Sequence, residues 1–173
     1  MTMRRTHVFF STPNLLIRSC AEEDIGWLGA LLSHADPDAT QRLMTLFETQ
    51  NLQTMSDRLL DLPAGAYLLV ALGQGGDPIG ALFSWPCTAS RFQIEMILEP
   101  EQRGRGLGSE FLRAWSHQFQ QHHGTTSLQI VVPQGFPCES SLFTSVGFVC
   151  CGEVDGHKVV ELAAACPSPA MAD

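Results

Sequence analysis

The chain has 173 residues, of which 45% are hydrophobic and 16% are charged, and its formal net charge at pH 7 is −8. This length and composition suffice for one domain with a core of its own. The acidic balance argues against a nucleic-acid partner, because binding to phosphates needs an excess of Lys and Arg. Residues 1–13 hold only the short apolar run 8–10, too short for a signal peptide or a membrane span, so we expect a cytoplasmic protein with no membrane partner.

The first half of the chain carries the signals of three helices and three strands. Asp36 is a good N-cap and Pro37 fits a first helical turn, because the cap side chain satisfies a free amide and proline lacks one. Several breakers at residues 73–78 mark a turn between two apolar runs. In chain order, we expect a strand at 15–18, helices beginning near 21 and 37, a third helix from 52 to 62, and strands at 67–72 and 79–85.

The second half begins with an apolar strand, a glycine-rich turn and an amphipathic helix that ends before Gly124. Asp155 and Gly156 form a hairpin turn between the last two strands. In chain order, we expect a strand at 92–98, a helix at 107–122, a strand at 128–132, a short helix within 140–146, and strands at 148–153 and 158–162. Alternating helices and strands are typical of a mixed α/β sheet.

The turn after the strand at 92–98 is the most informative segment. Gly104, Gly106 and Gly108 lack the Cβ atoms that would hold an anion away from the backbone, and glycine tolerates the positive φ that a tight turn requires. Arg103 and Arg105 add positive charge at the same place. Because the free amides of a helix N-terminus also point there, the segment predicts an anion-binding loop.

Two common anion-binding loops do not fit this sequence. A P-loop needs Lys followed by Ser or Thr after its glycines, whereas Ser109 and Glu110 follow here and the chain has a single lysine, Lys158. A dinucleotide-binding loop needs an acidic residue about 20 positions further on. None lies between Glu110 and Glu139.

The remaining pattern, Arg103-x-x-Gly106-x-Gly108, resembles the acetyl-CoA signature of the GNAT superfamily of N-acyltransferases. Residues 140–148, a short helix that runs into Gly-Phe, resemble the second signature of that family. The resemblance implies an α/β fold with a mixed, twisted central sheet of six or seven strands flanked by helices on both faces. It also implies an N-terminal extension at 1–14, an acetyl-CoA-binding acyltransferase domain at 15–163 and a flexible tail at 164–173.

The function that this resemblance implies is acetyl-CoA-dependent N-acetyl transfer, with acetyl-CoA as co-substrate and direct attack by an amine on its thioester. The acceptor would be a small-molecule or peptide amine, and the acidic surface mildly favours a cationic one. A homodimer is compatible with the sequence. The alternative is an acyl-CoA-binding regulatory module with weak or no catalysis, because the glycine loop supports both.

The resemblance also assigns roles to individual residues. In this family the signature strand is splayed from its neighbour, so its free backbone groups bind the pantetheine arm. The implied cofactor-binding residues are Met96, Ile97, Leu98, Arg103, Gly104, Arg105, Gly106, Leu107, Gly108, Ser109 and Phe143.

Glu95 is the candidate general base. It lies in the middle of the signature strand between Ile94 and Met96, where partial desolvation would raise its pKa. Alternation along the strand also permits a solvent-facing carboxylate on the same face as Gln93 and Glu99. Both interpretations remain open at this level.

The chain departs from the family pattern at two positions. Members of the family commonly have tyrosine at the position of Phe143, where it protonates the departing thiolate, and phenylalanine cannot donate a proton. A thiolate with a pKa near that of cysteine, about 8.5, is a tolerable leaving group without a dedicated acid. Cys138, Ser140 and Ser141 are alternative donors. The asparagine often found at the start of the same helix falls at Phe136.

The cysteines predict no disulfide framework, and the histidines make no metal pattern, so no metal is expected. The six cysteines have no framework spacing, and most are expected to be small apolar residues. His122 and His123 lie at a helix end, where capping is the favoured role. Cys150 and Cys151 are adjacent, so we expect them on opposite faces of a strand.

Overall fold

The computed structural model describes residues 7–164, which form one eight-stranded sheet in the order β1-β2-β3-β4-β5-β6-β8-β7. All neighbouring strands pair antiparallel except β5 and β6, which are parallel. The mixed sheet confirms the predicted fold class. The strands are β1 Phe9–Ser11, β2 Leu16–Ser19, β3 Tyr67–Leu72, β4 Pro78–Thr88, β5 Arg91–Leu98, β6 Ser127–Val131, β7 Val149–Val154 and β8 His157–Leu162.

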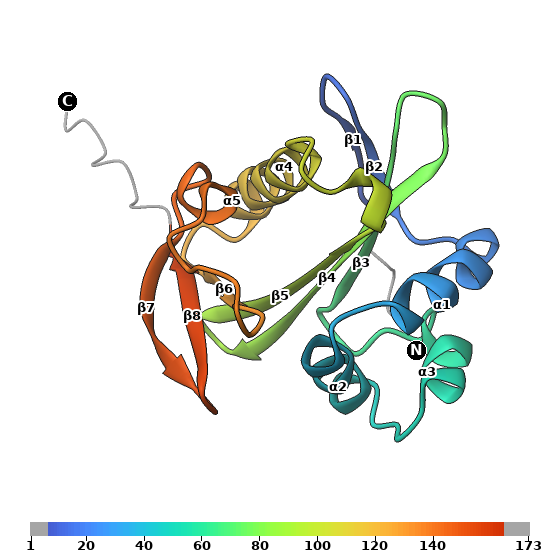
Figure 1. The fold of residues 1–173 in the computed structure, drawn as a ribbon, viewed down its shortest axis with the longest axis horizontal. Helices are drawn as coiled ribbons and strands as arrows, with labels where there is room; N and C mark the ends of the chain where they lie inside the picture. The colour runs from blue at the N-terminus through green and yellow to red at the C-terminus, as the bar shows by residue number, and fades with distance from the viewer. Residues whose placement is uncertain (1–6, 165–173) are drawn as a thin grey trace, which may run out of the picture.

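Helices cover both faces of the sheet, as predicted (Figure 1). The first three helices pack with β3, β4 and β5 into one apolar cluster, and the other two pack on the opposite face into a second cluster. The helices are α1 Ile25–Ser33, α2 Pro37–Leu46, α3 Leu52–Arg58, α4 Leu107–His122 and α5 Ser141–Thr144, with 3₁₀ turns η1 Glu22–Asp24 and η2 Pro100–Gln102.

The sheet has one strand more than the six or seven predicted, and the additional strand is the short β1. Phe9 pairs with Arg18 and Ser11 with Leu16, so the chain joins the sheet within the segment assigned to an N-terminal extension. Three residues are too few for a periodic pattern, and pairing with β2 makes this strand. Of the predicted tail at 164–173, all residues after Ala164 lie outside the described part of the chain. Within residues 7–164, no helix is both long and apolar enough to cross a membrane.

Local signals explain most element boundaries. The carboxylate of Asp36 accepts a hydrogen bond from the Ala39 amide at 3.1 Å, and α2 begins at Pro37 as predicted. Asn51 caps α3 in the same way, but α3 ends at Arg58 and not near residue 62. Asp155 and Gly156 have φ values of 50° and 78°, which confirms the tight turn between β7 and β8.

A partly buried ion pair ties β2 to the 3₁₀ turn η1. The guanidinium of Arg18 donates to both carboxylate oxygens of Asp24, at 2.6 and 3.0 Å. Asp24 also accepts from the amide of Ala21 at 2.8 Å, which fixes η1 against the strand. Burial raises the pKa of Asp24, but the bonds from Arg18 and Ala21 outweigh it and hold this pKa below its usual value.

The feature that positions the site is the separation of β5 from β6. Their pairing runs from Arg91–Ser127 to Ile94–Ile130 and stops there, whereas β5 stays paired with β4 as far as Leu98. Residues 95–98 therefore have a β4 partner on one side and no β6 partner on the other. Their edge of β5 opens toward the space between the two strands.

Candidate functional site

The glycine-rich turn has the backbone conformation that its sequence predicts. Gly104 and Gly106 have φ values of 72° and 78°, and Gly106 is the N-cap of α4. Residues other than glycine rarely adopt this backbone conformation. A Cβ built on either glycine meets no atom within 4 Å, so the space beside the turn is open.

Backbone amides at the start of α4 face this turn without helical partners. The Glu110 amide makes the first helical bond, to the Gly106 carbonyl at 3.1 Å. The amides of the first three helical residues remain available for an anion. Gly108 serves packing, because a Cβ there would lie 3.0 Å from Leu98 Cδ1 and 3.4 Å from Leu142 Cδ1.

The two arginines of the turn differ in their contacts. Arg103 donates from Nε and Nη2 to the Leu98 carbonyl, at 3.3 and 3.2 Å, and so ties the turn to the end of β5. Arg105 is exposed on the turn. An incoming anion would therefore meet Arg105 directly, whereas Arg103 would first have to leave the carbonyl.

The acidic residue in the first turns of α4 is held by the N-terminal segment. Glu110 accepts hydrogen bonds from the Thr12 hydroxyl and from the Asn14 amide, the latter at 3.0 Å. The side chain of Asn14 donates to the other carboxylate oxygen at 2.9 Å. Partial burial raises the pKa of Glu110, but the bonds from Thr12 and Asn14 lower it more. The turn between β1 and β2 is thereby fixed against the helix that follows the glycine loop.

Glu95 is buried, which excludes the interpretation of a solvent-facing carboxylate. Its exposed fraction is 4%, and it lies on the face of β5 that α2 covers. Its carboxylate pairs with the guanidinium of Arg42 on α2. Burial raises the pKa of Glu95, Arg42 lowers it, and the nearby Asp36 raises it slightly, so that its pKa lies above the usual value.

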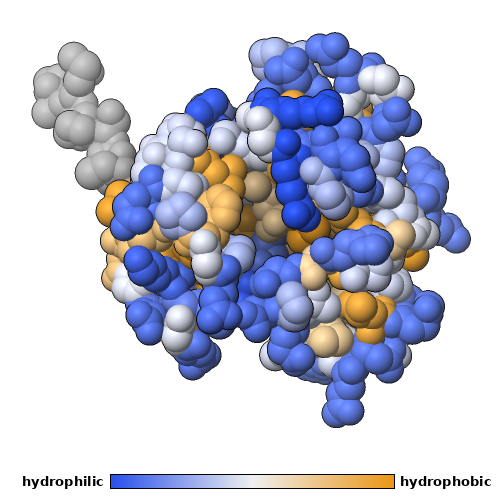
Figure 2. Space-filling view, in the orientation of Figure 1, coloured by the Kyte–Doolittle hydropathy of each residue, from blue (hydrophilic) through white to orange (hydrophobic). Residues whose placement is uncertain are grey.

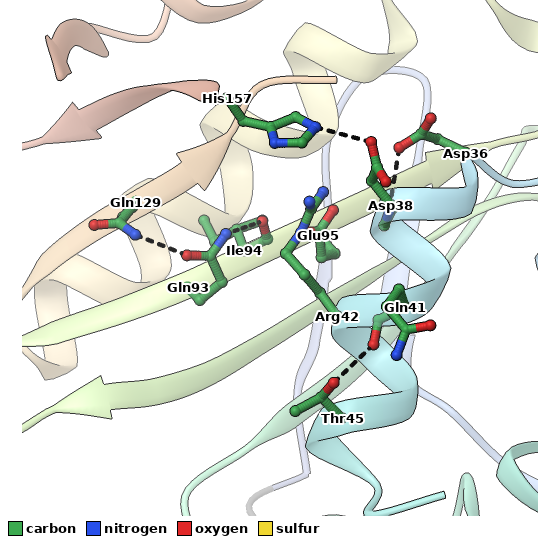
Figure 3. Close-up of polar contacts among 11 residues, drawn as sticks. Asp36, Asp38, Gln41, Arg42, Thr45, Gln93, Ile94, Glu95, Gln129 and His157 are labelled. Atoms are coloured by element: carbon green, nitrogen blue, oxygen red, sulfur yellow. Dashed lines mark hydrogen bonds and ion pairs between the residues drawn. The ribbon is translucent and has the colours of Figure 1, made fainter. Parts of the chain in front are cut away.

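A second polar contact near Glu95 joins His157 to Asp38. His157, at the start of β8, lies 2.8 Å through Nε2 from a carboxylate oxygen of Asp38 on α2 (Figure 3). Its Nδ1 lies 3.1 Å from the Asp155 carbonyl. With acceptors at both ring nitrogens, the protonated ring is favoured, and Asp38 is the main cause of the raised pKa of His157. The contact joins the β7–β8 hairpin to α2.

Sequence reasoning missed two of these residues, Arg42 and His157. Asp38 and Arg42 are four residues apart on α2 and so share one helical face, which was the available signal. Nothing in the local sequence indicates that His157 meets this face. The site thus holds the carboxylates of Glu95, Asp36 and Asp38 and the cationic groups of Arg42 and His157. The Nη2 atom of Arg42 is buried without a hydrogen-bond partner.

Phe143 is a buried residue of α5 with an exposed fraction of 3%. Its ring packs edge-on against Phe136, with centroids 5.8 Å apart, so the two positions that depart from the family pattern contact each other. The hydroxyl of Ser140, the N-cap of α5, is buried without a partner. Ser140 is therefore the more available donor among the alternatives to a tyrosine.

The face of the molecule that Figure 1 presents is hollowed and apolar in its middle. Figure 2 shows an orange hollow in the middle of the face presented in Figure 1, with hydrophilic surface around it. Two cavities of about 360 and 420 Å³ lie elsewhere, one against the segment 59–68 and the other against β1 and the end of α4. The open edge of β5 and the glycine turn thus form the candidate site, not these cavities.

No protein-family profile matches the sequence, and no curated protein matches it. Solved structures do match the fold. A GNAT superfamily phosphinothricin acetyltransferase from Sinorhizobium meliloti in complex with AcCoA has a TM-score of 0.65 and 17% identity, with 90% of this chain and 94% of that chain covered. A spermidine N-acetyltransferase mutant from Vibrio cholerae has a TM-score of 0.67 and 16% identity, with 86% of this chain and 92% of that chain covered. An aminoglycoside acetyltransferase in complex with coenzyme A has a TM-score of 0.63 and 18% identity, with 86% of this chain and 94% of that chain covered. The chain therefore has the fold of the GNAT superfamily of acetyltransferases.

Proposed function

We propose that this protein is an acetyl-CoA-dependent N-acetyltransferase in which an amine attacks the thioester directly. The observation that carries the proposal is the open edge of β5 next to the glycine turn, with a buried carboxylate on the same strand. Neighbours of the same fold that bind AcCoA or coenzyme A support it.

The residues of the turn fit a pyrophosphate group. Open space beside Gly104 and Gly106 admits close approach of the backbone, and the amides of Leu107, Gly108 and Ser109 point along the positive end of the α4 dipole. Arg105 adds a charged donor. When bound, acetyl-CoA would supply an activated acetyl thioester next to residues 96–98.

The proton of the acceptor ammonium would go to Glu95. Its raised pKa brings the carboxylate closer to the range in which it can take a proton from an amine, directly or through one water. Its pairing with Arg42 opposes this, so the base is strongest when an arriving acceptor loosens the ion pair. Free backbone groups of Met96, Ile97 and Leu98 would hold the pantetheine arm and stabilise the developing oxyanion.

The acceptor would enter between α2 and the β7–β8 hairpin, over Glu95. Asp36, the N-cap of α2, and Asp38 in its first turn attract an ammonium group, which agrees with the acidic composition of the chain. We therefore propose a small-molecule or peptide amine as acceptor. The spermidine, aminoglycoside and phosphinothricin acetyltransferases among the neighbours are named for small molecules.

Binding of acetyl-CoA is the first test. Isothermal titration of the wild-type protein should give a dissociation constant in the micromolar range or below, and Gly106→Val should abolish the heat of binding. Gly76→Val is the matched control, since Gly76 also has a positive φ, of 85°, and open space but lies in the β3–β4 turn. Equal loss in both variants, or no binding by folded wild type, would contradict the proposal.

Turnover is the second test. Release of free thiol should be followed with a panel of amines, and Glu95→Gln should lower the rate by about 10²-fold while acetyl-CoA affinity stays unchanged. A second function is favoured by the Arg42–Glu95 pair and by the absence of a hydroxyl at Phe143: an acyl-CoA-binding regulatory module. Binding without turnover on any amine would select that module.

A further inference from the structure

A cluster of possible metal ligands lies apart from the site around Glu95. The Sγ atoms of Cys138 and Cys150 and a carboxylate oxygen of Glu139 lie within 4.8 Å of one another, and no other such group of three occurs in residues 7–164. Cys138 and Glu139 directly precede Ser140, the N-cap of α5, whereas Cys150 lies on β7. The prediction of no metal did not include this cluster, because the fold brings together residues that are not adjacent in the sequence.

The strand pairing directs one thiol of the Cys150–Cys151 pair to the cluster. Cys150 is opposite Val160 and Gly152 is opposite Val159, so a β-bulge leaves Cys151 as the additional residue. The thiol of Cys151 lies 3.6 Å from the Val159 carbonyl. The thiol of Cys150 instead interacts with Cys138. Adjacent cysteines thus have separate surroundings, and Cys151 is a matched control for Cys150.

We propose that Cys138, Glu139 and Cys150 form a Zn²⁺ site whose fourth position is open to water. Two thiolates and a carboxylate are ligands that Zn²⁺ accepts, and the thiolates disfavour Mg²⁺ and Ca²⁺. Zn–S bonds of about 2.3 Å at a tetrahedral angle place two sulfurs roughly 3.8 Å apart, so only small side-chain movements are needed.

Burial and charge agree with this assignment. Cys138 is buried, with an exposed fraction of 1%, whereas Glu139 and Cys150 are exposed, so one ligand is fixed in the core and solvent reaches the others. Two thiolates and one carboxylate carry three negative charges, of which Zn²⁺ neutralises two. The ammonium of Lys158 adds a weaker favourable interaction with Glu139.

The ion would connect the start of α5 to β7. Binding releases the thiol protons and links two segments that strand pairing does not join directly. Because only the folded chain brings the three ligands together, zinc should stabilise it by mass action. The segment fixed in this way leads into the helix that carries Phe143.

The test uses the full chain, reduced and freed of metal, with a thiol count to establish its state. Zinc affinity is measured by competition with a chromophoric chelator, and Co²⁺ is added separately to detect thiolate-to-cobalt charge transfer. We expect one zinc per chain, cobalt bands and a higher Tm with zinc. Cys150→Ser, at an exposed position, should weaken binding by at least about tenfold and remove the cobalt bands, and Glu139→Gln should weaken it less.

Cys151→Ser should bind zinc as the wild type does. Equal loss in Cys151→Ser and Cys150→Ser would overturn the site, as would a folded wild type that gives no cobalt bands. A Cys138–Cys150 disulfide that persists under reductant and prevents zinc uptake would also overturn it. Since Cys138→Ser alters a buried residue, it is interpreted only if its circular dichroism matches that of the wild type.

Discussion

The guanidinium of Arg42 on α2 is paired with the carboxylate of Glu95 on β5, beneath the helical face of the sheet. The pair has opposite consequences for the two roles that Glu95 could have. It stabilises a buried negative charge and thereby the fold, but it also lowers the basicity that proton transfer requires. Burial still prevails, since the pKa of Glu95 lies above its ordinary value.

Arg42→Met should raise the pKa of Glu95 further, because Arg42 contributes both a hydrogen bond and a charge that lower it. If Glu95 is the base, the acid limb of the rate profile moves to higher pH. The folded pKa then lies well above the unfolded one, so the variant is destabilised at neutral pH, by about 3–5 kcal/mol at most, and regains stability as the pH falls.

Profiles of rate and Tm against pH for this variant measure both effects. Arg91→Met is the control, since Arg91 is exposed and pairs with Glu161, at 3.7 Å, and not with Glu95. It should change neither profile. An acid limb that stays in place in Arg42→Met would assign the proton transfer to a group other than Glu95.

Phe143→Tyr tests the demand for an acid at the leaving thiolate. Because Phe143 is 3% exposed, the added hydroxyl is expected to be buried without a partner and to cost about 1–3 kcal/mol in the free energy of unfolding, with no gain in turnover. Phe136→Tyr is the control, since that ring is 42% exposed and its hydroxyl can reach water. Faster turnover in Phe143→Tyr alone would show that thiolate departure limits the reaction.

Asp24→Asn should destabilise the fold by about 1–3 kcal/mol at neutral pH, because Arg18 loses its partner. The folded pKa of Asp24 is depressed, so in the wild type this contribution is present above the unfolded pKa of about 3.9 and is lost as the pH falls through the folded value. The difference in Tm between variant and wild type should therefore shrink in acid. Glu23→Gln, 78% exposed and 3.8 Å from Arg18, should leave Tm unchanged.

Asp38→Asn should lower the pKa of His157, since Asp38 is the main cause of its raised value. The titration of the imidazole resonances by NMR measures this directly. In the wild type, the stability that the charged Asp38–His157 pair contributes is fully present below the unfolded pKa of histidine, and it is lost as the pH rises through the raised folded pKa. Asp57→Asn on α3 should not change the His157 titration.

Elements with a strong local signal were predicted close to their observed bounds. The N-cap Asp36, the helix from Leu107 and the Asp155–Gly156 turn depend on contacts within a few residues, which a sequence pattern records. The strand β1 depends on pairing with β2, and the end of α3 at Arg58 precedes the last apolar residue of its pattern. Such boundaries are set by tertiary contacts, which the local pattern does not contain.

The candidate site divides in the same way. The glycine turn is contiguous in the sequence, so its conformation followed from its residues. Glu95, by contrast, is buried because α2 covers it, and its partner Arg42 lies 53 residues away in the sequence. The Asp38–His157 contact spans 119 residues, which no spacing rule covers.

The β7–β8 hairpin reaches α2 only because of its length. His157 lies next to the turn and meets Asp38 at 2.8 Å. Each strand residue adds about 3.4 Å, so a hairpin two residues longer on each strand would carry its turn roughly 7 Å further, and one two residues shorter would fall as far short. Changes in this loop could therefore widen or narrow the entrance above Glu95 while every residue of β5 and of the glycine turn stays the same.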